Sequence, residues 1–184
     1  MPWPAICLRA ARLNSSPKAR SGSSTREALA GRGLSTVRFN FRGLDGSGGR
    51  ASGGVEEWQD VRAVAEWMRQ NAAPNVALVG YSFGALMAAR AVAEGERPHA
   101  FAAVGFPTTI IGDHADRLAE VARAIATGIP WLFLQGDRDQ FCELERIRGW
   151  AAPNVDIQVI EGAGHFFADA GEVCARVANF LIRA

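Results

Sequence analysis

The sequence has little of several residue types on which other classes of protein depend. Only three of its 184 residues are cysteines (Cys7, Cys142 and Cys174), with no Cys-x-x-Cys pair, so we expect no disulfide framework and no cysteine-based zinc site. No apolar run approaches the roughly 20 residues that cross a bilayer. A formal net charge of only +1 gives no electrostatic reason to expect a nucleic acid or a membrane as partner. Since the start of the chain also lacks the charged-then-apolar order of a secretory signal, we expect a cytoplasmic protein.

What the sequence does contain is a series of short aliphatic runs separated by amphipathic stretches. Hydrophobic residues make up 48% of the chain, and the length suits one domain over residues 1–184 with a single core. Continuous apolar runs are typical of strands covered on both faces, and helices between them favour a parallel sheet. The sequence therefore predicts an α/β fold with a mainly parallel sheet of about six strands, at residues 4–8, 34–40, 75–80, 100–106, 130–136 and 155–160.

Two segments interrupt this pattern. Residues 14–25 are rich in serine, arginine and glycine, and we interpret them as a loop between a strand and a helix. Residues 43–54 contain six glycines, which raises the alternative of a phosphate-binding loop. That alternative is disfavoured because no Gly-Lys-Ser/Thr follows and the strand–G-x-G-x-x-G–helix order is missing. We expect a flexible loop at the carboxyl end of a strand.

One serine stands where a buried strand meets a helix. Residues 80–84 read Gly-Tyr-Ser-Phe-Gly, which fits the pattern G-x-S-x-G, and an Ala-rich helical pattern follows at once. In such a sharp turn Ser82 adopts a strained backbone conformation, and its hydroxyl is raised above the edge of the sheet. The backbone N–H of Phe83, at the start of the helix, would then face a developing oxyanion. The alternative is a tight turn that only packs the strand against the helix.

A serine hydroxyl needs a base to remove its proton, and the base needs an acid to orient it. Asp137 and Asp139 follow the predicted strand at 130–136, and His165 follows the strand at 155–160. The order Ser, Asp, His, with each residue after a separate parallel strand, predicts a catalytic triad. The alternatives are that Asp139 caps a helix beginning near Gln140 and that His165 is a loop histidine bonded to backbone.

Four segments together resemble one family. Residues 38–43 (Arg-Phe-Asn-Phe-Arg-Gly), 80–84, 136–139 and 164–167 look like those of the α/β-hydrolase superfamily, close to its compact, lidless bacterial serine hydrolases of the esterase or dienelactone-hydrolase type. The resemblance runs from about Glu27 to the end of the chain and implies a single three-layer domain with a minimal lid or none. It also implies that the acid is Asp139, because superfamily usage resembles Gly-x-x-Asp, and that the enzyme is carboxylesterase-like.

The resemblance also defines an expected reaction. Ser82 would attack an ester, thioester or related acyl bond of a small substrate, while His165 moves protons and Asp139 orients His165. No cofactor and no metal are expected, because the cluster of Asp113, His114 and Asp116 matches no standard ligand set. Two alternatives remain open, namely a catalytically impaired binding or regulatory protein on the same scaffold and an acyltransferase. The oligomeric state is left undetermined.

The start of the chain departs from the family pattern. Superfamily members usually carry a His-Gly or His-Pro loop after the strand corresponding to residues 4–8, and that loop supplies a second oxyanion N–H. Here the strand is followed by Arg9-Ala10-Ala11-Arg12, so the amino-terminal part is shortened or atypical. If this strand neighbours the nucleophile strand, the segment from Arg9 to Arg12 is expected to pass close to Ser82 and to supply the second N–H.

Overall fold

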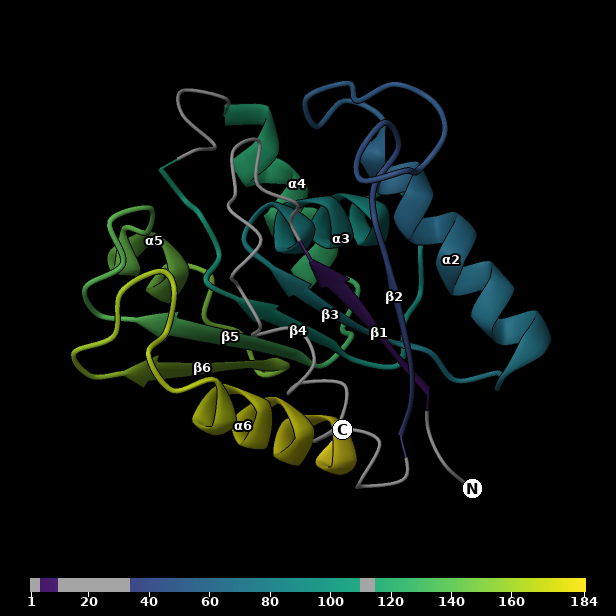
Figure 1. Ribbon diagram of the computed structural model, residues 1–184. Coiled ribbons are helices and arrows are strands. Elements are labelled where there is room, and N and C mark those ends of the chain that lie inside the picture. Colours follow the sequence, from purple (N-terminus) through teal and green to yellow (C-terminus); the bar gives the residue numbers. More distant parts are fainter. Residues whose placement is uncertain (1–3, 10–33, 110–114) are drawn as a thin grey trace.

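The computed structural model describes residues 4–9, 34–109 and 115–184 (Figure 1). The loop predicted at residues 14–25, and Asp113 and His114 of the acidic cluster, lie outside these residues. The strands are β1 (Pro4–Arg9), β2 (Ser35–Phe39), β3 (Ala77–Tyr81), β4 (Phe101–Val104), β5 (Trp131–Gly136) and β6 (Val155–Ile160). The helices are α2 (Glu57–Asn71), α3 (Phe83–Ala93), α4 (Ala115–Ile125), α5 (Leu144–Arg148) and α6 (Ala170–Arg183).

The strands form one parallel sheet in the order β2-β1-β3-β4-β5-β6. The α/β class and the parallel sheet predicted from the aliphatic runs are therefore confirmed. β1 pairs with both β2 and β3, and Leu8 lies opposite Gly80, so the first strand does neighbour the strand that leads to Ser82. That the chain folds as a single domain over 1–184 stays a prediction.

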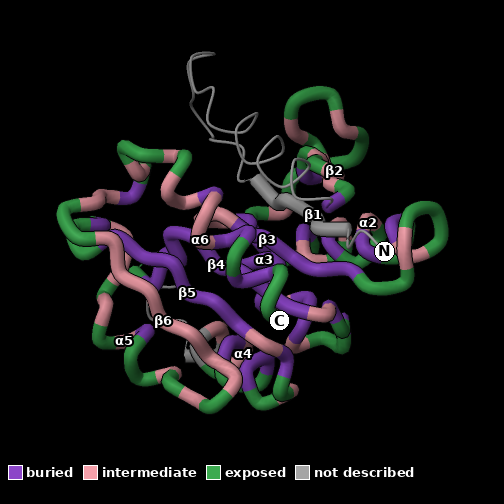
Figure 2. The backbone as a smooth tube through the Cα atoms, turned by 90° about the horizontal axis from the view of Figure 1, so that it is seen from below, coloured by how far each residue is buried: buried purple, intermediate pink, exposed green. Residues whose placement is uncertain are grey.

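Two apolar layers enclose the sheet. Leu78, Phe101 and Phe133 point to one face and pack with α2, α3 and α4, whereas the alternate residues Val79 and Leu134 point to the other face and pack with α6. This alternation follows from the period of two along a strand. In Figure 2 the central strands β3, β4 and β5 are buried along nearly their whole length, while β6, at the edge of the sheet, is only partly buried. The result is the three-layer arrangement implied by the family resemblance.

The glycine-rich segment 43–54 is held more firmly than its composition predicts. The carboxylate of Glu57, at the start of α2, accepts the backbone N–H and the hydroxyl of Ser52, each at 2.6 Å, and the N–H of Gly54 at 2.8 Å. At the other end of the segment, Arg42 makes a forked contact with Asp60 of α2, with Nε at 2.9 Å and Nη2 at 2.7 Å from Oδ1. The expected flexible loop is thus tied to one helix at both ends, by Glu57 near its end and by the contact of Asp60 with Arg42 just before its start.

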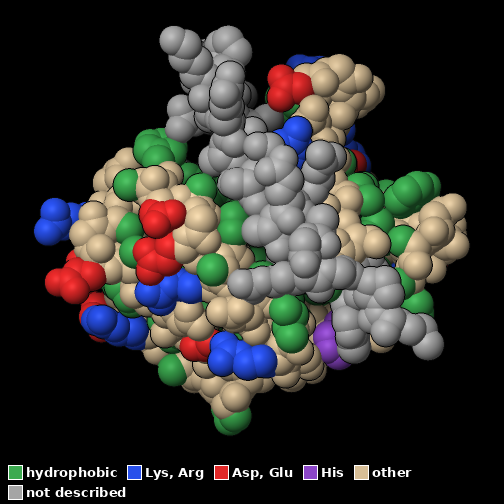
Figure 3. All heavy atoms as spheres, turned by 60° about the horizontal axis from the view of Figure 1, so that its bottom comes forward, with side chains coloured by type: hydrophobic (Ala, Val, Ile, Leu, Met, Phe, Trp, Pro, Cys, Tyr) green, Lys and Arg blue, Asp and Glu red, His purple; other side chains and the backbone are tan. Residues whose placement is uncertain are grey.

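The surface carries mixed charge. On the face that includes α6, acidic and basic side chains lie among small groups of hydrophobic side chains (Figure 3). In the part of the chain that the structure describes, no helix has both the length and the apolar character needed to cross a membrane.

Candidate active site

The turn between β3 and α3 has the geometry that the Gly-Tyr-Ser-Phe-Gly pattern predicts. Ser82 has φ 53° and ψ −121°, in the region that side chains rarely adopt. The turn is held in place because the N–H of Ser82 donates to Val104 at 3.0 Å and its carbonyl accepts from Ala85 at 2.9 Å. A Cβ on Gly80 would lie 2.5 Å from Cα of Ala85, so the strand and the helix can approach this closely only with glycine at position 80.

The side chain of His165 reaches this serine from the loop after β6. Its Nε2 lies 2.9 Å from Oγ of Ser82, although the two residues are 83 positions apart in the sequence. The hydroxyl can donate to the imidazole at this distance, which is the arrangement required for removal of its proton. The parallel sheet brings the two residues together because the carboxyl ends of β3 and β6 lie at the same edge.

Asp139 completes the constellation. Its Oδ2 lies 2.8 Å from Nδ1 of His165, and its Oδ1 accepts the N–H of Phe141 at 2.8 Å. With Nδ1–H facing a carboxylate, Nε2 is left free of its proton and able to accept one from Ser82. Asp137 is exposed and has no such contact, so of the two candidate aspartates the structure brings only Asp139 to the histidine.

The triad lies in a largely apolar and aromatic setting. His165 and Asp139 are only 4% and 5% exposed. Three aromatic rings surround the imidazole of His165. The centroid of its ring lies 4.8 Å from that of Phe141 and 5.3 Å from those of Tyr81 and Phe166. The hydroxyl of Tyr81 donates to the carbonyl of His165 at 2.8 Å, a contact that sequence reasoning did not identify because Tyr81 is a variable position of the motif. Burial of the histidine and the aspartate strengthens the electrostatic interaction between them.

The loops that carry the acid and the base are locked together. A Cβ on Gly136, the last residue of β5, would lie 2.2 Å from the carbonyl oxygen of Ala163, and the N–H of Arg138 donates to that same oxygen at 2.9 Å. Asp139 and His165 therefore sit on two loops in direct backbone contact. Gly136 and Gly164, noted in the sequence, flank this contact. Position 136 has to be glycine because a side chain there would overlap with Ala163.

The backbone N–H expected to face an oxyanion lies directly after the serine. Phe83 is the first residue of α3, so its backbone N–H has no acceptor within the helix. The positive end of the helix dipole lies at the same place, where a developing negative charge is stabilised. The second donor was expected from Arg9 to Arg12. Arg9 ends β1 opposite Tyr81, next to the elbow, and residues 10–12 lie outside the described part of the chain.

The structure offers no other cluster with comparable chemistry among the residues that it describes. Within them, no group of three or more His, Cys, Asp or Glu side chains could hold a metal ion. Cys142, near the triad, is a poor nucleophile because burial, opposed in part by a hydrogen bond with Thr108, raises the pKa of its thiol to about 11.

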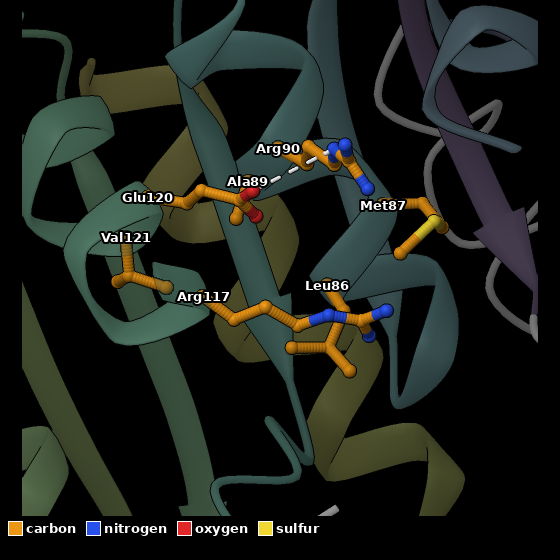
Figure 4. A pocket seen from close by; sticks show the side chains of 7 residues that line it. All are labelled: Leu86, Met87, Ala89, Arg90, Arg117, Glu120 and Val121. Atoms are coloured by element: carbon orange, nitrogen blue, oxygen red, sulfur yellow. Dashed lines mark ion pairs between the residues drawn. The ribbon is translucent and has the colours of Figure 1, made fainter. Parts of the chain in front are cut away.

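A small cavity between α3 and α4 is separate from the triad. It is lined by Leu86, Met87, Ala89, Arg90, Arg117, Glu120 and Val121 (Figure 4). Arg90 and Glu120 face each other across it at 3.7 Å. Its space of ≈ 10 Å³ is enough for about one water molecule. None of the lining residues belongs to the triad, and no acyl group would fit there.

A three-layer parallel α/β fold with a serine elbow, a histidine and an aspartate at the carboxyl edge of its sheet is the architecture of the α/β hydrolases. The model of a family described as "Alpha/beta hydrolase domain" matches residues 18–178, and the chain belongs to that family.

Individual proteins are similar to this chain over most of its length. An uncharacterized protein of Rickettsia prowazekii (strain Madrid E) is 29% identical over 162 residues, which are 82% of this chain and 66% of that protein. The chain thus spans just under two thirds of that relative's length. An alpha-beta serine hydrolase homologue from Coxiella burnetii is 27% identical, with a TM-score of 0.76 over 98% of this chain and 84% of its own. A serine hydrolase without lid from Xanthomonas campestris is 26% identical, with a TM-score of 0.76 over 100% of this chain and 83% of its own.

Proposed function

We propose that the protein is a cofactor-free serine hydrolase, carboxylesterase-like, that cleaves an ester, thioester or related acyl bond of a small substrate through an acyl-enzyme intermediate. One observation carries the proposal. Two hydrogen bonds in series join Ser82 to His165 at 2.9 Å and His165 to Asp139 at 2.8 Å, and Ser82 has a strained backbone with φ 53°. An accidental serine–histidine contact would not need a strained serine, an oriented imidazole and a buried carboxylate at once.

In the first half of the reaction, Oγ of Ser82 attacks the carbonyl carbon of the substrate while its proton passes to Nε2 of His165. The carbonyl π electrons move to oxygen, and the N–H of Phe83 stabilises the resulting oxyanion. When the carbonyl re-forms, the bond to the leaving alcohol or thiol breaks, and the imidazolium returns the proton to that group. Asp139 stays ionised throughout and holds Nδ1–H of His165, so that the proton is exchanged only at Nε2.

In the second half, water takes the place of the leaving group. Nε2 of His165 accepts a proton from the water as its oxygen attacks the acyl carbon, and the same proton is given to Oγ of Ser82 when the acyl–serine bond breaks. The carboxylic acid leaves and the enzyme is regenerated. The names of the Coxiella and Xanthomonas relatives, which describe a serine hydrolase homologue and a serine hydrolase, support this chemistry.

Labelling with a fluorophosphonate probe tests the proposal. We expect one label per chain on Ser82, with none in Ser82→Ala, and hydrolysis of at least one member of a panel of ester, thioester, lactone and amide substrates. Folded protein that neither binds the probe nor hydrolyses any substrate would instead indicate a binding or regulatory protein. Product analysis with added alcohols and amines separates a hydrolase from an acyltransferase, because a transferase gives new esters or amides in place of free acid.

A further inference from the structure

β5 contains a buried glutamine to which the reaction steps above give no role. Gln135 is 0% exposed, and an amide removed from water needs hydrogen-bond partners at both ends. Both ends have one. Its Oε1 accepts the backbone N–H of Phe106 at 2.8 Å, and its Nε2 donates to Oδ2 of Asp139 at 2.6 Å.

These two partners fix the orientation of the amide. The N–H of Phe106 can only donate and the ionised carboxylate of Asp139 can only accept, so a reversed amide would place donor against donor and acceptor against acceptor. Oδ2 of Asp139 is also the oxygen that faces His165, at 2.8 Å. With Phe141 on Oδ1, the carboxylate is held by three donors, and its plane is fixed relative to the imidazole.

We propose that Gln135 is a positioning residue of the triad, which holds the carboxylate of Asp139 against Nδ1 of the His165 imidazole and stabilises part of its negative charge. The inference rests on the proposed serine hydrolase function, since it assigns Gln135 a task within the same triad. Gln135 is too deeply buried to touch a substrate, so it acts through Asp139 alone.

The surrounding contacts supply a matched control. The segment after β4 and the loop of Asp139 are joined by two further hydrogen bonds, from the N–H of Glu143 to Oγ1 of Thr108 at 2.6 Å and from the N–H of Thr109 to the carbonyl of Phe141 at 3.1 Å. Thr108 is as buried as Gln135 and joins the same two segments, but it has no hydrogen bond to the Asp139 carboxylate. Thr108→Val therefore weakens the junction without removing a donor from the triad.

Two substitutions at position 135 test the role. Gln135→Met keeps the approximate volume and removes both hydrogen bonds. Gln135→Glu keeps an acceptor for Phe106 and, because two buried carboxyl groups in contact do not both ionise, retains a proton that it can donate to Asp139. We expect kcat to fall about ten- to hundredfold in Gln135→Met and by less in Gln135→Glu, which keeps a donor to Asp139. KM should change by less than about threefold, because the residue makes no contact with ground-state substrate.

The pH profile separates positioning from simple packing. Gln135→Met removes a donor from the Asp139 carboxylate and leaves more negative charge facing His165, which favours its imidazolium form, so the acid limb of kcat/KM should move to higher pH. The other titratable groups near the Asp139 carboxylate, Cys142 and Glu143, are unchanged in these variants. Thr108→Val should lower Tm and leave the acid limb in place.

An NMR titration of the His165 ring nitrogens, assigned by their absence in His165→Asn, gives the same information without turnover. We expect its midpoint to rise in Gln135→Met, by less in Gln135→Glu, and not at all in Thr108→Val. Unchanged kcat and an unchanged midpoint in folded Gln135 variants would overturn the inference, as would an equal effect of Thr108→Val. A wild-type protein that shows no turnover and no probe labelling would instead refute the proposed function, while the titration still decides whether Gln135 acts on His165 through Asp139.

Discussion

Ser82 holds a backbone conformation that costs about 1–3 kcal/mol. The surrounding bonds compensate for it, because Ser82 donates to Val104 and accepts from Ala85, and Gly80 leaves room for the helix to approach. A strained residue that its neighbours fix so completely is expected where the side chain has to be presented at one defined point. Here that point is 2.9 Å from Nε2 of His165.

Removal of the nucleophile or of the base should abolish activity with little loss of stability. We expect Ser82→Ala and His165→Ala each to lower kcat by about 10⁶-fold, and the double variant to be no worse, because the members of a triad act as one unit. Steady-state kinetics with an activated ester, together with thermal unfolding of each variant, measure the two effects. Clearly additive losses in the double variant would contradict a shared step.

The two aspartates of the same loop should respond very differently. Asp139→Asn keeps the shape of the side chain, but its amide either donates an N–H to His165 or accepts only weakly, so it no longer fixes the tautomer of the histidine. We expect kcat to fall by about 10⁴-fold, less than for Ser82→Ala. Asp137→Asn, on the exposed side of the loop, should change kcat by less than about twofold. The two variants compared under identical conditions decide the assignment, and a larger loss in Asp137→Asn would show that the acid has been misidentified.

The sequence predicted which residues meet but not how they are supported. The order Ser82, Asp139, His165 at successive strand ends was enough to predict their convergence, because parallel strands end at one edge. Their catalytic roles stay a prediction until variants are measured. Gln135 escaped notice, since a glutamine within an aliphatic run reads as part of a strand. Phe106 becomes its partner only through the pairing of β4 with β5, and Asp139 only through the turn that follows β5.

At the scale of the elements, the boundaries that differ from expectation have local causes. The strand predicted over 100–106 ends at Val104, because Gly105 turns to φ 56° and its Cβ position is crowded by Tyr81, Phe167 and His165. The helix that the alternative interpretation of Asp139 placed near Gln140 begins at Leu144. Asp139 uses Oδ1 for the N–H of Phe141 in a tight turn instead of capping a helix. Such choices depend on tertiary contacts that no local pattern reveals.

The link between α2 and the glycine-rich segment 43–54 should be visible as a pH dependence of stability. Burial acts to raise the pKa of Glu57, but hydrogen bonds from Ser52 and Gly54 outweigh it and lower the pKa from 4.5 to about 2. Since the folded-state value is depressed, the stabilisation is complete above about pH 4.5 and is lost as the pH falls toward about 2. It amounts to roughly 3 kcal/mol of unfolding free energy at neutral pH.

Glu57→Gln tests this link. We expect the unfolding free energy at pH 7 to fall by about 2 kcal/mol, because one acceptor oxygen is replaced by a donor that faces donors. The dependence of stability on pH between about 4.5 and 2 should flatten. Glu56→Gln is the matched control. The carboxylate of Glu56 pairs with Arg42 at the surface, so this substitution should lower the unfolding free energy by less than about 1 kcal/mol. Denaturant unfolding over a pH series measures both, and equal losses would disprove the special role of Glu57.

At the scale of the whole molecule, the chain between β4 and β5 limits what can cover the site. Residues 105–130 have room for one helix, and α4 packs against α3 instead of forming a multi-helix lid. We expect short acyl esters such as acetate and butyrate to be hydrolysed with a much higher kcat/KM than palmitate. Rates with an emulsified substrate should not jump above its solubility limit, and a strong interfacial activation would contradict an open site.

The separation of 83 residues between Ser82 and His165 also bears on how the protein is made. At about 5–20 residues per second, the ribosome releases the serine elbow roughly 4–17 seconds before the histidine. During this interval β3 and α3 can already form, yet the hydroxyl has no base beside it and is as unreactive as any free alcohol. Under the proposed mechanism the nascent chain is thus unreactive toward cellular esters and thioesters, and reactivity begins only when β6 joins the edge of the sheet and His165 reaches Ser82.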